Sequence, residues 1–145
     1  MNAVSALAAV ALPPLLLAVL VMSVWKTARG LSARRWERPG WWVFPAVVLV
    51  GAGCAVWFAG VFSGGLDARE ACAERGAPYD EGYRSEHWSE PSRLFPLHNR
   101  CNTDYDLVPA FVNPTLVVVA VLLVGCAAGA VAAAFIERKK RDTRH

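Results

Sequence analysis

Three long apolar runs constrain this chain more than any other feature: residues 3–25, 41–62 and 107–136 contain no Asp, Glu, Lys, Arg or His. A helix rises about 1.5 Å per residue, so about 20 apolar residues can cross a hydrocarbon layer about 30 Å thick. In lipid, a helix also satisfies its own backbone hydrogen bonds. A soluble helical core would instead show polar residues recurring along one face of each run. We therefore predict an all-α integral membrane protein with three transmembrane helices.

The composition agrees with a membrane protein of modest size. The chain has 145 residues, of which 55% are hydrophobic, and its mean hydropathy is +0.33. An ordinary soluble domain has a lower apolar content. The excess is concentrated in the three runs, which leaves one long polar segment at residues 64–108.

The charges divide sharply between the segments that connect the apolar runs. The linker at residues 26–40 carries five basic residues and one acid, and the tail at residues 137–145 is also basic. The segment at residues 64–113 instead carries nine acids and five arginines. Short loops rich in Lys and Arg stay in the cytoplasm. We predict a plasma (inner) membrane protein whose N-terminus is outside, whose C-terminus is cytoplasmic and whose acidic segment is extracytoplasmic.

The first apolar run is expected to remain as a helix instead of being removed as a secretory signal. It lacks a basic region before the apolar stretch, and its basic residues follow it. Pro13 and Pro14 should kink this helix, because proline removes a backbone donor and clashes with the preceding turn. The predicted boundaries are a helix at 1–25, a linker at 26–40, a helix at 41–63, an extracytoplasmic loop at 64–113, a helix at 114–136 and a tail at 137–145.

The third apolar run is too long for one straight crossing. Asn113 followed by Pro114 is typical of a helix start, with a cap residue before a proline at the first helical position. We therefore expect the spanning helix to begin at Pro114. Residues 107–112 would then form an apolar stretch that lies along the outer membrane surface.

Small residues in the second and third runs suggest where helices pack closely. Small side chains on one face let helix backbones approach each other in lipid, and residues 125 and 129 form a G-x-x-x-G pattern. The pattern does not distinguish packing within the chain from packing against a second chain. The predicted helix-packing residues are Gly51, Ala55, Gly125, Gly129 and Ala133.

The four cysteines fall into two pairs. Cys54 and Cys126 lie within apolar runs without charged neighbours, and we expect them to be unreactive packing residues. Cys72 and Cys101 share the segment predicted to be extracytoplasmic, where disulfides form and persist. We predict a disulfide between them, which would fasten a loop with few aliphatic residues for a core of its own.

Three chemical alternatives compete for the polar segment. A zinc site could use Cys72, His87, His98 and Cys101, although only His98 and Cys101 have a suitable spacing. A thiol oxidoreductase would normally show C-x-x-C, which this sequence lacks. A hydrolase could use Ser85, Glu86 and His87, but these residues form no recognisable catalytic motif. We expect no catalytic residues, no metal and no cofactor.

Aromatic, apolar and arginine residues within this segment are better candidates for protein recognition. Trp, Tyr and Arg often anchor interfaces. The alternative is that these side chains pack on the membrane surface or around the disulfide. The candidate interaction residues are Tyr79, Tyr83, Trp88, Arg93, Leu94, Phe95 and Leu97.

These features favour a non-catalytic accessory or scaffold subunit. The apolar runs offer no ionisable residue for a proton relay or a charged substrate, so a pore or transporter would require oligomerisation. A loop-based thiol-redox or hydrolytic enzyme is the other alternative. The expected partners are the lipid bilayer and a membrane or extracytoplasmic protein, which could be a second copy of the chain. The basic segments are read as topology signals and not as a nucleic-acid site.

Overall fold

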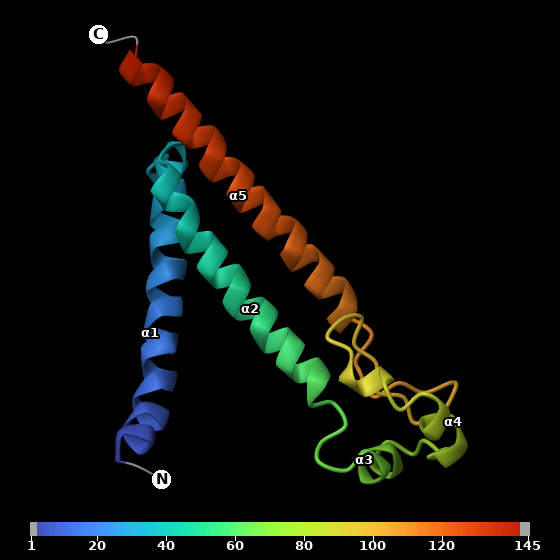
Figure 1. The fold of residues 1–145 in the computed structure, drawn as a ribbon. Coiled ribbons are helices and arrows are strands. Elements are labelled where there is room, and N and C mark those ends of the chain that lie inside the picture. The colour runs from blue at the N-terminus through green and yellow to red at the C-terminus, as the bar shows by residue number, and fades with distance from the viewer. Residues whose placement is uncertain (1–2, 143–145) are drawn as a thin grey trace. The chain divides into compact units, whose positions relative to one another are not determined.

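The computed structural model describes residues 3–142, with side chains from Pro14 onward, and the described residues are helical except for turns, loops and one isolated β-bridge. Figure 1 shows the long helices and the shorter helices between α2 and α5. In chain order the elements are α1 (Ala3–Ser32), η1 (Arg35–Glu37), η2 (Pro39–Trp42), α2 (Val43–Val61), α3 (Ala68–Glu74), α4 (Glu81–Glu86), η3 (Glu90–Ser92) and α5 (Val112–Asp142). The three η elements are 3-10 helices.

Three helical stretches are long and apolar enough to cross a membrane: Pro14–Ser32, Pro39–Val61 and Val112–Asp142. Many of their apolar side chains are exposed, as Leu17 at 63% and Val124 at 70% illustrate. Apolar helices with exposed apolar side chains are typical of a membrane protein. The prediction of an all-helical chain with three membrane-spanning candidates is confirmed for the described residues.

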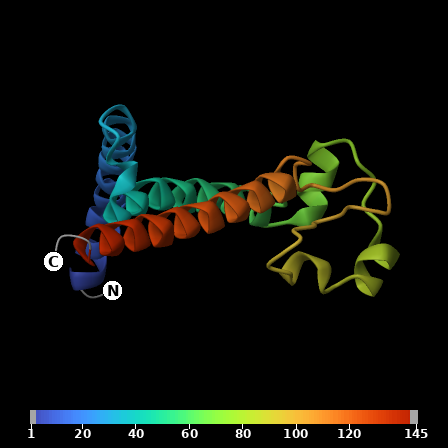
Figure 2. The ribbon, with the colours of Figure 1, turned by 90° about the horizontal axis from the view of Figure 1, so that it is seen from above.

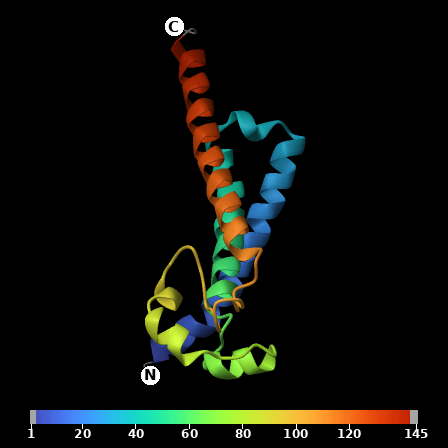
Figure 3. The ribbon, with the colours of Figure 1, turned by 90° about the vertical axis from the view of Figure 1, so that its right-hand side faces the viewer.

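The helix α1 continues well into the basic linker. Lysine, alanine, arginine and leucine after Trp25 are good helix formers, and the helix continues through Gly30 to Ser32. The chain leaves α1 at Ser32, and Arg34 then takes a left-handed backbone conformation with a φ of 51°. Figure 3 shows the connection turning from α1 into the start of α2. The helix is continuous through both prolines, and the kink expected at Pro13 and Pro14 stays a prediction.

The helix α5 begins at Val112, two residues before the predicted start at Pro114, and continues through the basic residues to Asp142. Its last turns are polar and carry an i,i+4 ion pair between Arg141 and Glu137, with the two charged atoms 3.2 Å apart. Helical structure therefore extends beyond the apolar residues at this end.

The chain divides into two compact units, which we describe separately. The disulfide unit is Ala52–Ala120 and contains the polar segment with the adjoining parts of α2 and α5. The basic unit consists of the described residues before and after it, and contains α1, the linker and the remaining parts of α2 and α5. Figure 2 shows the short helices and loops into which the polar segment folds.

The disulfide unit has a small protein core, contrary to the expectation of a loop without one. Cys72, Cys101 and Leu107 are fully buried together, and Leu97, Val108 and Val112 form a second buried cluster. The expectation that residues 107–112 lie along a membrane surface is wrong for Leu107 and Val112, because both side chains are 0% exposed. Leu107 is covered by the disulfide cluster, and Val112 is covered by the cluster with Leu97 and Val108.

Candidate functional site

The predicted disulfide is present and organises the polar segment. Cys72 of α3 is bonded to Cys101, with a Cα–Cα distance of 5.9 Å and a sequence separation of 29. Leu107 is buried against both cysteines, and Tyr79 and Tyr105 pack around this cluster. Covalent closure restricts the unfolded chain, and the added burial stabilises the closed form. The disulfide therefore joins the entry of the segment to its exit.

The short helices begin at aspartate caps. The Asp67 carboxylate accepts a hydrogen bond from the Arg69 N–H at 2.8 Å, and the Asp80 carboxylate accepts one from the Tyr83 N–H at 3.0 Å. Such caps satisfy backbone donors that have no partner within a helix. The Asp80 N–H also donates to the Cys101 carbonyl at 2.9 Å. The start of α4 is thereby fixed next to the disulfide.

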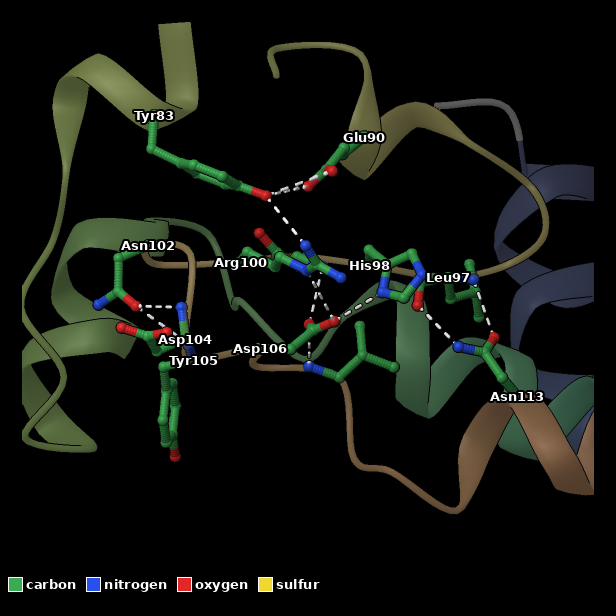
Figure 4. Close-up of polar contacts among 12 residues, drawn as sticks. Tyr83, Glu90, Leu97, His98, Arg100, Asn102, Asp104, Tyr105, Asp106 and Asn113 are labelled. Atoms are coloured by element: carbon green, nitrogen blue, oxygen red, sulfur yellow. Dashed lines mark hydrogen bonds and ion pairs between the residues drawn. The ribbon is translucent and has the colours of Figure 1, made fainter. Parts of the chain in front are cut away.

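Asp106 is the centre of the polar contacts in this unit, as Figure 4 shows. Its Oδ1 accepts backbone hydrogen bonds from Asn99 at 3.0 Å and from Val108 at 2.9 Å. Its Oδ2 lies 2.7 Å from His98 Nδ1 and 3.9 Å from Arg100 Nε. One carboxylate thus bridges two chain segments that run past each other, where Arg100 and Asp106 form an isolated antiparallel bridge. Charge-assisted hydrogen bonds of this kind are stronger than neutral ones.

Two arginines of the disulfide unit point into the folded segment. Arg84 of α4 donates to the Asn99 side-chain oxygen at 3.0 Å and to the Arg100 carbonyl at 2.8 Å. Arg100 donates to the Tyr83 hydroxyl at 3.2 Å, and that hydroxyl lies 3.4 Å from a carboxylate oxygen of Glu90. The hydrogen bond to Tyr83 is the main cause of a raised pKa of Arg100.

Two side chains from the long helices hold the segment between η3 and the disulfide. The Trp57 indole N–H of α2 donates to the Leu94 carbonyl at 3.1 Å. The Asn113 amide of α5 makes a pair of hydrogen bonds to Leu97, accepting from its N–H and donating to its carbonyl, each at 2.9 Å (Figure 4). Asn113 was predicted to cap a helix, but it lies within the first turn of α5 and binds this segment instead. Residues 94–97 are therefore fixed next to the helix ends.

The predicted interaction residues differ in their exposure. Trp88 is 77% exposed, Leu94 73% and Phe95 54%, and Arg93 is also exposed. Tyr79 and Tyr83 are half-buried, since the first packs around the disulfide and the second makes the contacts with Arg100 and Glu90. Leu97 is only 3% exposed and belongs to the core, so it cannot be part of a surface anchor. Trp88 is the most exposed aromatic residue of the set.

The acidic excess of this segment lies on its surface. Of the nine acids between residues 64 and 113, seven are exposed, and three of the five arginines are exposed. The other two acids, Glu90 and Asp106, are half-buried together with Arg84 and Arg100. The internal charges balance, so the whole net charge of −4 faces outward. Such a surface favours encounters with positively charged partners.

The residues considered for chemistry make structural contacts in this unit. The disulfide uses the sulfur atoms of Cys72 and Cys101, which removes two of the four ligands considered for zinc. The Ser85 hydroxyl donates to the Gly82 carbonyl at 2.8 Å, and His87 Nδ1 lies 2.9 Å from the Tyr83 carbonyl. The His87 ring also stacks on Tyr83 with the ring centroids 4.2 Å apart. These contacts hold α4 and its C-terminal turn together.

Three of the five predicted helix-packing residues are closely packed within the chain, and the other two are not. A Cβ atom added to Gly51 would lie 2.5 Å from the Leu20 side chain, and one added to Gly129 would lie 2.5 Å from the Trp42 ring. Ala133 is buried at 5% exposure. A Cβ at Gly125 would meet no atom within 4 Å, and Ala55 is exposed. Gly129 is thus used for packing within the chain.

Several positioning residues were missed by sequence reasoning. Trp57 and Asn113 fix the segment through partners 37 and 16 residues away in sequence. Asp106 does so through partners that lie 2 to 8 residues away. A local signal existed around Asn102, whose side-chain oxygen accepts from the backbone N–H groups of Asp104 at 2.8 Å and Tyr105 at 3.0 Å. Asn and Asp commonly make such turns. The partners of Asp106 could not be read from that signal.

Comparison of the chain with known protein families, curated proteins and solved structures finds no match.

Proposed function

We propose that the protein is a membrane-anchored, non-catalytic interaction subunit whose disulfide unit binds an extracytoplasmic protein. The observation that carries this proposal is Trp88, which is 77% exposed although the unit around it is fastened by a disulfide and the contacts of Asp106. Exposure of a tryptophan leaves a large apolar area in water, and tryptophan is enriched among the residues that dominate binding energy. A fixed surface loses little conformational entropy when a partner binds.

The proposed partner carries basic residues around an apolar pocket. Glu86 lies two residues before Trp88 in sequence, and the exposed charges of the segment are predominantly acidic. Charge complementarity of this kind speeds association and selects partners, while a buried aromatic residue supplies affinity.

In this proposal Leu94 and Phe95 contact lipid and not the protein partner. Their neighbours Trp57 and Asn113 tie the segment to the ends of the long helices, where exposed apolar side chains meet lipid.

The proposed orientation places the disulfide unit outside the plasma (inner) membrane, with the N-terminus outside and the C-terminus in the cytoplasm. The basic linker and tail support this orientation, because short segments rich in Lys and Arg remain cytoplasmic. A disulfide is also expected in an oxidising compartment.

Accessibility of introduced cysteines tests the orientation. In a background where Cys54 and Cys126 are replaced by alanine, single cysteines at Arg35, Arg141 and Ser85 would be treated with an impermeant thiol reagent in intact cells. We expect labelling at position 85 only, and labelling at positions 35 and 141 after the membrane is permeabilised. Labelling at 35 and 141 but not at 85 in intact cells would reverse the proposed orientation.

Photocrosslinking in intact cells tests the partner surface. A photoreactive phenylalanine analogue at position 88 should give a discrete crosslinked product with a second protein. The same analogue at Glu74, an exposed position on α3, is the matched control and should give less of that product. Charge reversal by Glu86→Lys should reduce the product at position 88, because the proposed partner surface is basic. Equal crosslinking from positions 74 and 88, or only a product of two identical chains, would contradict the proposal.

A further inference from the structure

A cavity with basic walls lies in the basic unit. It has a volume of about 940 Å³ and is lined by the last turns of α1, the linker, the start of α2 and one residue of α5. Four cationic residues line it: Lys26, Arg29, Arg35 and Arg38. We call this cavity and its four cations the basic corner. The corner is separate from the surface around Trp88, which belongs to the disulfide unit.

The positive charge of the basic corner is not neutralised by its own wall. Glu137 is the single acidic residue that lines the cavity, and its carboxylate is paired with Arg141 at 3.2 Å. The neighbouring acid Glu37 lies 3.7 Å from Lys140 and not against one of the four cations. Across residues 14–142, no ion pair joins any of these four cations to an acid. Like charges gathered around a concave surface produce a potential that attracts anions.

Aromatic rings orient two of the cations. The Lys26 Nζ atom lies 4.8 Å from the centre of the Phe44 ring, and the Arg29 guanidinium lies 4.3 Å from the centre of the Trp25 ring. Cation–π contacts restrict these long side chains without neutralising their charge. Trp41, which is only 8% exposed, closes another side of the cavity. The cations are thus partly positioned before an anion arrives, which lowers the entropy that binding would cost.

The close approach of the linker to α1 depends on one glycine. The Trp41 indole packs directly against Gly30, and a Cβ atom at position 30 would collide with the ring. The Trp42 indole N–H donates to the Trp36 carbonyl at 3.1 Å, which closes the linker on itself. These contacts hold Arg35 and Arg38 of the linker around the same cavity as Lys26 and Arg29 of α1.

We propose that the basic corner binds a phosphate group. Arginine matches phosphate because its planar guanidinium can donate two parallel hydrogen bonds, and lysine adds a compact charge. The volume exceeds that of a single phosphate, so a phosphate with organic substituents fits the cavity. The same chemistry is offered by the headgroup of an anionic phospholipid and by a free phosphate in solution. This inference does not rest on the proposed function, because its residues and ligand differ.

Equilibrium binding to the full-length protein in neutral detergent tests the proposal. The probes are dioctanoyl phosphatidylglycerol, which is anionic, dioctanoyl phosphatidylcholine, which is zwitterionic, and inorganic phosphate and pyrophosphate. We expect at least one anionic probe to bind about tenfold more tightly than phosphatidylcholine. Raising the salt from about 0.05 M to about 0.5 M should weaken that binding severalfold, because electrostatic attraction is screened.

A matched pair of double variants locates the binding. Arg29→Gln with Arg38→Gln removes two cations of the corner and should weaken anion binding about tenfold, as expected when two charge-assisted contacts are lost. Arg34→Gln with Arg138→Gln removes the same charge from exposed positions that do not line the cavity, and should change binding less than about twofold. Helix content measured by circular dichroism checks that both variants fold. If the double variant Arg29→Gln with Arg38→Gln does not fold, Arg29→Lys with Arg38→Lys is used in its place. This variant should bind the anion more weakly than the wild type, and its binding should still weaken as salt is raised.

The two sources of phosphate give different results. If phosphatidylglycerol binds and millimolar inorganic phosphate or pyrophosphate does not displace it, the corner takes a lipid headgroup. If the free anions bind with the same dependence on Arg29 and Arg38, the ligand is a soluble phosphate. The proposal is overturned if no anion binds better than phosphatidylcholine, or if the two double variants weaken binding equally.

Discussion

The polar segment and the three long helices use apolar side chains in opposite ways. In the helices, only 11%, 11% and 17% of the most apolar stretches of the three spans are buried in protein. In the polar segment, Leu107 is 0% exposed and Leu97 is 3% exposed. An apolar side chain of a membrane-spanning helix can be covered by lipid, whereas one in a segment in water is shielded only where the protein itself covers it.

This contrast teaches that the most polar part of the chain is the part with a conventional fold. The disulfide unit has buried clusters, capped helices and a central carboxylate, although it contains few aliphatic residues. The helices need none of these features for their backbones, because each helix satisfies its own hydrogen bonds. Substitutions that affect protein packing should therefore act mainly in the disulfide unit and at the tight linker.

Loss of the disulfide should produce the largest change in stability. Cys72→Ser with Cys101→Ser releases a loop closed across 29 residues, for which chain entropy predicts a loss of about 3–4 kcal/mol. The measurement is the free energy of local unfolding of the segment, followed by protease accessibility in mild detergent. Cys54→Ala with Cys126→Ala is the control and should leave the segment protected. Equal protection in all variants would show that the disulfide is not what fastens the unit.

Removal of the Asp106 carboxylate should produce the next largest change. Asp106→Ala leaves the backbone N–H groups of Asn99 and Val108 without their acceptor, which should cost about 2–3 kcal/mol. Protease protection and thermal melting would measure the loss. Asp104→Ala removes an exposed carboxylate close by in sequence and should change stability by less than about 0.5 kcal/mol. Similar losses for both variants would contradict the central role of Asp106.

A methyl group added at Gly30 tests the packing of the linker on α1. Gly30→Ala places a Cβ atom against the Trp41 indole and should destabilise this corner by about 1–3 kcal/mol, despite the higher helix propensity of alanine. Gly40→Ala is a matched control, because a Cβ there meets nothing within 4 Å. The melting temperature in mild detergent would compare them. A Gly30→Ala protein as stable as Gly40→Ala would show that the indole can move away at little cost.

Trp88→Ala should have the smallest effect on stability and a large effect on recognition. The side chain is 77% exposed, so its removal should lower the free energy of unfolding by less than about 1 kcal/mol. The crosslinked product expected from a photoreactive group at Ser89, a neighbouring position, should nevertheless decrease severalfold. Leu97→Ala is the opposite control, because this buried residue should be needed for stability. A large loss of stability in Trp88→Ala would assign that residue to folding instead of binding.

The sequence alone determined the class of fold and the covalent bond of the polar segment. Apolar runs without charges predicted the three helices, because only the helix pairs its own backbone groups over that length. Cys72 and Cys101 predicted the disulfide, because they share the one segment suited to it. These inferences depend on composition and local order along the chain.

Only the tertiary structure decided which residues of the polar segment are surface and which are core. Leu97 and Trp88 look equally available in the sequence, but Asn113 binds the backbone at Leu97 while Trp88 stays exposed. Asp106 gains its role from Asn99, His98 and Arg100, and the basic corner gathers cations from α1 and the linker. Such sites are made by residues separated along the chain, so their contacts depend on how the turns close in space. Local pattern cannot specify that closure, because it is fixed by the disulfide and by burial.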